Sequence, residues 1–118
     1  MGKIFLTSDL HFGHDRGFIY EPRGFKSVED HDETIIENWN KVVGPEDDVY
    51  VLGDLMLNDN AHGIECIKRL NGNIHIVRGN HDTDRRVVMY ESCQNVIDPV
   101  LYADMLHYKG YHFYLSHF

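Results

Sequence analysis

Short apolar runs alternate with helical patterns along this chain. Runs rich in β-branched and aromatic side chains predict buried strands at 3–6, 49–52 and 74–78. A first helix is predicted from Ser27 to the stop at Gly44-Pro45, and a second from 58–60 to the turn at Gly72. Residues 85–91 predict a third helix, and 96–101 and 106–115 predict later strands with a turn at Lys109-Gly110. This order predicts an α/β chain of βαβ units with a parallel sheet.

The first helix has the clearest local signals. Ser27-Val28-Glu29-Asp30 approximates a capping box, and Trp39 belongs to an apolar stripe that we expect in the core. The acidic runs at 29–33 and 46–48 are interpreted as solvated charges at helix starts or in loops. Cys66 is expected to be a small core residue. Five histidines are interpreted as structural or solvated: His31, His62, His75, His107 and His112.

Each of the three predicted strands runs straight into side chains that can bind a metal. Asp9 and His11 follow the first strand, Asp54 follows the second after Gly53, and Gly79-Asn80-His81-Asp82 follows the third. Functional groups of α/β folds lie where strands finish, so the three clusters predict one shared site for one or two divalent cations.

Residue type suggests a role for several of these side chains. Asp9 and His11 would point to the same side of an extended chain, as a mixed oxygen and nitrogen pair suited to Mn, Fe or Zn. Asp54 could give one carboxylate oxygen to each of two ions. Asn80 could ligate through its amide oxygen. His81 could reach a substrate, with Asp82 orienting its imidazole.

Simpler interpretations of the same residues stay open. Asp9 could cap a turn and His11 could be a polar loop residue. Gly-Asp after a strand is common in turns, and the third cluster could be a solvated turn.

The ordered set Asp9-x-His11, Gly53-Asp54, Gly79-Asn80-His81-Asp82 and Ser116-His117 resembles the calcineurin-like metallophosphoesterases, in particular their small bacterial and phage members. The resemblance implies a metallophosphoesterase-type α/β/β/α sandwich, with residues 1–118 as a single domain. It further implies that Asp9 and His11 bind a first metal, that Asp54 bridges, and that Asn80 and His117 bind a second. His81 would contact the scissile phosphate and protonate the leaving group, with Asp82 behind it.

One element of the family pattern is absent. The family closes with Gly-His-x-His on a later strand, which gives one histidine to each metal, and this sequence has no such motif before Phe118. We therefore expect the fold to be incomplete at the C-terminus relative to the family. A reduced form of the fold is the alternative.

The resemblance implies a dinuclear metal-dependent hydrolase that cleaves a phosphate mono- or diester by attack of a metal-bound hydroxide. Mn, Fe and Zn all suit the ligands, and Mn is favoured. Two other classes stay open: a catalytically silent binding or scaffold protein on the same fold, and a structural or storage metal domain. Neither class would need a proton donor such as His81 with Asp82 behind it.

Charge and composition narrow the partners. The net charge of −8 argues against broad capture of duplex nucleic acid and favours a phosphorylated small molecule or nucleotide, with nucleic acid still open. No apolar run is long enough to span a membrane, no secretory signal is evident, and the two cysteines suggest no disulfide framework. We therefore expect a cytoplasmic protein without membrane contacts. His14, Arg23 and Arg78 are candidate substrate-binding residues, although ordinary surface positions explain them equally well.

Overall fold

The computed structural model describes residues 2–13, 27–56, 60–79 and 82–117. It contains a parallel sheet of four strands in the order β1-β2-β3-β4, and a separate antiparallel pair, β5-β6. The parallel strands are β1 (Ile4–Thr7), β2 (Asp48–Leu52), β3 (Asn73–Val77) and β4 (Val96–Leu101). The predicted α/β class with a parallel sheet is therefore confirmed.

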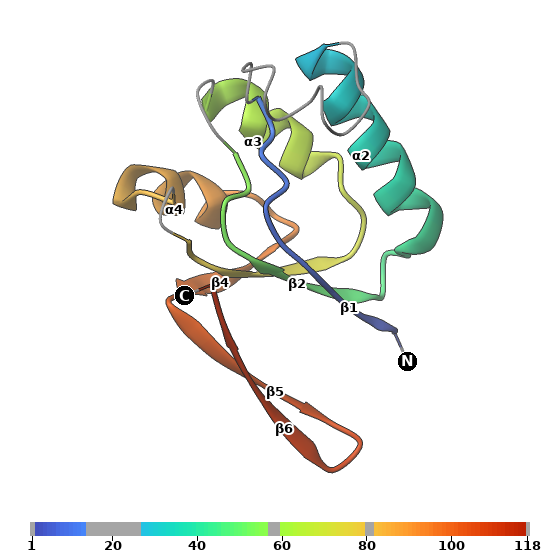
Figure 1. Cartoon of the computed structure of the whole chain (residues 1–118), viewed down its shortest axis with the longest axis vertical. Helices are drawn as coiled ribbons and strands as arrows, with labels where there is room; N and C mark the ends of the chain where they lie inside the picture. Colours follow the sequence, from blue (N-terminus) through green and yellow to red (C-terminus); the bar gives the residue numbers. More distant parts are fainter. Residues whose placement is uncertain (1, 14–26, 57–59, 80–81, 118) are drawn as a thin grey trace.

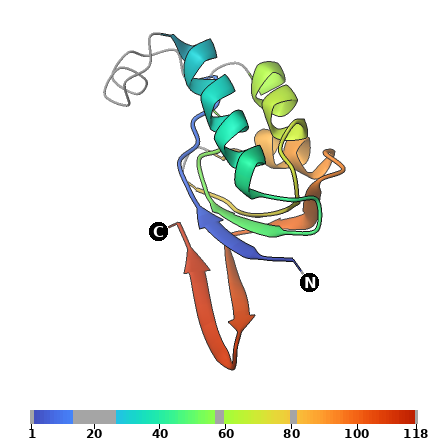
Figure 2. The ribbon, with the colours of Figure 1, turned by 90° about the vertical axis from the view of Figure 1, so that its right-hand side faces the viewer.

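In the described part of the chain, three helices connect the parallel strands: α2 (Val28–Val42), α3 (Asn60–Lys68) and α4 (Asp84–Glu91). In both views they lie on one side of the sheet, while the hairpin of β5 (Ala103–Tyr108) and β6 (Tyr111–Ser116) extends from the other side (Figures 1 and 2). Lys109 and Gly110 both have positive φ, 50° and 82°, which suits the two-residue turn of a hairpin.

The main core lies between the helices and the sheet. Val49 and Val51 of β2 face it, together with Ile74 and Ile76 of β3 and Trp39 of α2. The intervening residues of β2 face the hairpin, where Leu106 and Leu115 form a smaller apolar cluster with Val77. Because successive residues of a strand point to opposite faces of the sheet, alternate residues face the helices and the residues between them face the hairpin.

The helix boundaries follow from their caps. Ser27 is the N-cap of α2, and its hydroxyl accepts a hydrogen bond from the Asp30 N–H at 3.1 Å, as the capping pattern predicted. The predicted end of α3 at Gly72 was too late, because the helix ends at Lys68. The Asn95 amide nitrogen donates to the carbonyls of Ile67 and Leu70 and so satisfies that end.

One charged residue of a predicted surface segment is buried. Asp32, which we had interpreted as a solvated charge of its acidic run, is only 1% exposed, as is the neighbouring His31. The Asp32 carboxylate accepts a hydrogen bond from the Gly13 N–H and contacts the rings of His31 and His62. These partners offset the loss of hydration, so the carboxylate can be buried.

Among the described helices, none is both long and apolar enough to cross a membrane.

Candidate metal centre

Side chains from the ends of β1 and β2 meet at one edge of the sheet. Asp9, His11 and Asp54 each place a ligand atom within 4.8 Å of the others. The Asp9 Oδ1 and His11 Nε2 atoms are 3.6 Å apart. The structure therefore brings these three residues together, and their role as metal ligands stays a prediction.

The backbone reaches this arrangement in an unexpected way. Asp9, His11 and Asp54 all adopt left-handed conformations, with φ of 56°, 55° and 55°. The predicted extended path for Asp9 and His11 was therefore wrong, although their side chains do approach each other. Left-handed backbone is strained for non-glycine residues and persists only where surrounding contacts impose it.

Backbone hydrogen bonds between the two loops impose that conformation. The Asp9 N–H donates to the Gly53 carbonyl at 3.1 Å, and the His11 N–H donates to the Asp54 carbonyl at 3.1 Å. The next bond runs from the Phe12 N–H to the Leu55 carbonyl at 2.8 Å. Parallel pairing of β1 and β2 thus continues past the strand ends and carries the ligand side chains together.

His117 arrives from the end of β6. Its Nε2 lies 3.7 Å from the Asp54 Oδ2 atom, and its Nδ1 lies 2.7 Å from the Leu52 carbonyl oxygen. Because a carbonyl only accepts, Nδ1 carries a proton and donates it to Leu52, which turns the Nε2 atom toward Asp54. This is the contact that commonly orients a metal-binding histidine. We call Asp9, His11, Asp54 and His117 the strand-end site.

Two glycines leave the room that these side chains occupy. A Cβ atom on Gly79 would lie 2.6 Å from the Asp54 Oδ1 atom and 3.0 Å from the His117 ring. A Cβ on Gly53 would collide with the same ring. Close approach of the β2 and β3 loops is therefore possible only with glycine at these positions.

The side chain of Asp82 ties those two loops together. Its Oδ2 atom accepts hydrogen bonds from the N–H groups of Asp54 at 2.8 Å and of Gly79 at 2.7 Å. Its Oδ1 atom accepts one from the hydroxyl of Tyr90 at 2.7 Å. Burial, and next the Asp82 carboxylate, raise the pKa of Tyr90, so this hydroxyl stays protonated and donates.

Arg78 is held within the protein beside this loop. Its guanidinium donates to the Asp82 carbonyl at 2.8 Å, pairs with Asp84 at 2.9 Å and lies 4.6 Å over the ring of Tyr102. A substrate-binding role for Arg78 stays a prediction. His14, Arg23, Asn80 and His81 lie outside the described residues, so their predicted roles, including the orientation of the His81 imidazole by Asp82, also stay predictions.

The strand-end site suits a divalent cation. Two carboxylates and two imidazoles converge there. The negative charges of Asp9 and Asp54 repel each other at this separation, and a cation bound between them would offset that repulsion. The side chain of Asp9 is 45% exposed, so solvent can reach the site, whereas that of Asp54 is 5% exposed. Carboxylate and imidazole ligands fit Mn, Fe or Zn.

Comparison with known proteins agrees with this chemistry. The family model for calcineurin-like phosphoesterases matches residues 2–117. The chain belongs to that family. The family is metal-dependent, and the strand-end site supplies candidate ligands.

Several relatives resemble the chain over most of its length. An uncharacterized protein of Methanocaldococcus jannaschii is 48% identical over 84 residues, which are 70% of this chain and 48% of that protein. The gene 66 protein of Mycobacterium phage L5 is 37% identical over 86 residues, or 70% of this chain and 41% of that protein. The chain thus matches less than half the length of these relatives.

A solved structure also superimposes on the whole chain. It is a protein of unknown function from Aquifex aeolicus, with a TM-score of 0.74 and 30% sequence identity, and the match covers 100% of this chain and 61% of that one.

Sequence reasoning missed Tyr90. The signal was present, because Val87 and Tyr90 are three residues apart in the predicted third helix and share its inner face. A buried tyrosine hydroxyl needs a polar partner, and Asp82 is that partner.

We expect Tyr90→Phe to lower the free energy of unfolding by about 1–2 kcal/mol, because the buried Asp82 carboxylate loses a hydrogen-bond donor. Tyr111→Phe is the matched control, since Tyr111 is 70% exposed. Urea denaturation measures both. Equal stability of the two variants would contradict the role assigned to the Tyr90 hydroxyl.

Gly79→Ala should weaken Mn²⁺ binding by about 10–100-fold, as loss of a ligand-orienting contact does in metal sites. The new methyl group would displace Asp54 and His117. Gly44→Ala is the control, because its Cβ would meet only the Asp47 carboxylate at 3.6 Å. Titration of both metal-free variants, after circular dichroism has shown that they are folded, makes the comparison. Unchanged affinity in Gly79→Ala would show that Asp54 and His117 do not bind the metal.

Proposed function

We propose that this chain is a dinuclear metal-dependent phosphoesterase. The observation that carries the proposal is the position of Asp54, whose carboxylate has a ligand atom within 4.8 Å of those of Asp9 and His11 and lies 3.7 Å from the His117 Nε2 atom. A carboxylate between two ligand groups can serve two ions at once, and phosphoesterase chemistry commonly uses such a pair.

The proposed ligands divide into two groups. Asp9 and His11 would hold one cation, Asn80 and His117 the other, and Asp54 both. Bound cations would polarise the phosphoryl group and lower the pKa of a coordinated water, which makes a nucleophile available near neutral pH. Mn is favoured among the metals that suit these ligands.

His81 is the proposed proton donor. It follows Asn80 directly in the chain, so it would lie close to the metals and could protonate the oxygen of the leaving group. The rigid attachment of Asp82 to the loops of Asp54 and Gly79 supports this, because it fixes the backbone next to His81. A donor held in position can contribute about 10²–10⁴-fold to the rate.

The proposed substrate is a phosphorylated small molecule or nucleotide. The net charge of −8 disfavours electrostatic capture of long duplex nucleic acid. The proposed location is the cytoplasm, in keeping with two buried cysteines that are free thiols.

The test is hydrolysis of bis(p-nitrophenyl) phosphate and of a dialkyl phosphate with Mn²⁺ present. We expect Asp54→Asn to abolish turnover of both, because both ions lose a ligand. His81→Ala should keep its Mn²⁺ and lose more activity toward the alkyl leaving group, by about 10²-fold or more. Glu37→Gln is the control, since it removes one exposed charge on α2 without touching the site.

Three outcomes would contradict parts of this account. Wild-type protein that binds Mn²⁺ without turnover would favour a silent binding or scaffold protein. Full activity in Asp54→Asn would remove its bridging role. Equal losses for good and poor leaving groups in His81→Ala would remove the proton-donor assignment.

A further inference from the structure

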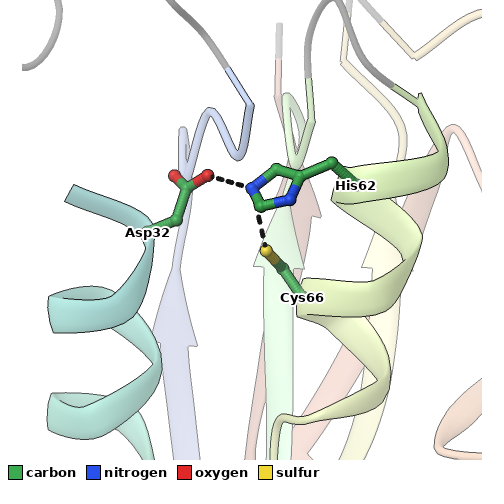
Figure 3. A group of neighbouring side chains, drawn as sticks. All are labelled: Asp32, His62 and Cys66. Carbon is green, nitrogen blue, oxygen red and sulfur yellow. Dashed lines mark hydrogen bonds and ion pairs between the residues drawn. The ribbon is translucent and has the colours of Figure 1, made fainter. Parts of the chain in front are cut away.

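A second group of metal-ligand side chains lies between α2 and α3. Asp32 is the fifth residue of α2. His62 and Cys66 are four residues apart on α3, so they share one face of that helix. Their ligand atoms all lie within 4.8 Å of one another. Figure 3 shows the three side chains pointing toward one another across the two helices. We call Asp32, His62 and Cys66 the interhelix cluster.

The cluster does not have the geometry of a nucleophilic triad. In such a triad the thiol and the carboxylate contact different nitrogens of the histidine. Here His62 Nε2 is 2.7 Å from the Asp32 Oδ2 atom and 3.5 Å from the Cys66 Sγ atom. Burial, and next the charge of Asp32, raise the pKa of Cys66 to about 12, so the thiol is not a nucleophile at neutral pH.

These separations are close to those around a tetrahedral ion. Ligands at the usual zinc distances would place the sulfur and the ring nitrogen roughly 3.6 Å apart, and the carboxylate oxygen and the ring nitrogen roughly 3.3 Å apart. The first value matches the 3.5 Å between Cys66 and His62. The 2.7 Å between the Asp32 Oδ2 and His62 Nε2 atoms is shorter than the second value. Binding of an ion would therefore require these two atoms to move apart by less than about 1 Å.

The charge around the thiol favours a cation. The Asp32 carboxylate has an oxygen within 4.8 Å of the Cys66 thiol, and Glu65 directly precedes Cys66 on α3. The Arg69 guanidinium is held by both oxygens of Glu33, at 2.5 and 2.7 Å. The local field is therefore negative, which stabilises a bound cation.

The ligands are also held in position. Asp32 is 1% exposed, its Oδ2 atom accepts from the Gly13 N–H at 3.0 Å, and its Oδ1 atom lies 2.9 Å from His31 Nδ1. Such outer contacts orient the ligands of metal sites. The side chain of His62 is 39% exposed, which leaves a route for an ion and room for water as a fourth ligand.

We propose that Asp32, His62 and Cys66 bind a divalent cation of the zinc class. Oxygen, nitrogen and sulfur ligands in one tetrahedral set suit Zn²⁺, whereas Mn²⁺ and Mg²⁺ prefer oxygen. The ion would fasten α2 to α3 and, through the Asp32–Gly13 hydrogen bond, the segment that carries His11. This site is separate from the strand-end site and does not depend on phosphoesterase activity.

Cobalt provides a direct test, because Co²⁺ replaces Zn²⁺ and reports a thiolate ligand by charge-transfer absorption in the near ultraviolet. No cysteine is among the proposed ligands of the strand-end site, so this band would report the interhelix cluster alone. We expect metal-free protein to develop the band with one equivalent of Co²⁺, together with the visible bands of a tetrahedral ion, and to lose both when Zn²⁺ is added.

Variants assign the band to its ligands. Cys66→Ser and His62→Gln should lose it, whereas Cys93→Ser, at the other buried cysteine, and Asp54→Asn should keep it. His62 is partly exposed, so His62→Gln remains a test if Cys66→Ser does not fold. Absence of the band in the wild type, its survival in either cluster variant, or its loss in Asp54→Asn would overturn the proposal. Hydrolysis with Mn²⁺ is measured separately, so the phosphoesterase proposal can fail or hold independently.

Discussion

The arrangement of the strand-end site depends on one buried carboxylate. Asp82, 2% exposed, accepts hydrogen bonds from the N–H groups of Asp54 and Gly79 and from the Tyr90 hydroxyl. A buried carboxylate without such donors would be costly, so burial of Asp82 and closure of the two loops stabilise each other. The loops after β2 and β3 are thereby joined to each other and to α4, which holds the backbone that carries the Asp54 side chain.

Backbone strain and close approach are the second requirement of the site. Asp9, His11 and Asp54 are left-handed, and Gly53 and Gly79 are the positions where any side chain would meet His117. The parallel hydrogen bonds that continue past β1 and β2 compensate for that strain. Strained backbone that brings two carboxylates together is typical of a site whose geometry is set for a ligand rather than for stability.

Features that depend on neighbouring residues were predicted from the sequence, whereas features that depend on contacts between distant segments were not. Strands, the Ser27 cap and the Lys109-Gly110 turn depend on nearby residues and were confirmed. The left-handed Asp9 and His11 were not predictable, because carbonyls more than 40 residues away impose them. Burial of Asp32 was missed for the same reason: its partners Gly13 and His62 come from other segments. His62 and Cys66 are four residues apart in the sequence, but only the structure shows that the Asp32 carboxylate lies beside them.

The most direct test of a dinuclear strand-end site is calorimetric titration of metal-free protein with Mn²⁺. Mn²⁺ discriminates against the thiol-containing interhelix cluster, so the stoichiometry reports the strand-end ligands. We expect two equivalents in the wild type and none in Asp54→Asn, because the Asp54 carboxylate lies close both to Asp9 and His11 and to His117. A single equivalent, or binding that Asp54→Asn leaves unchanged, would contradict it.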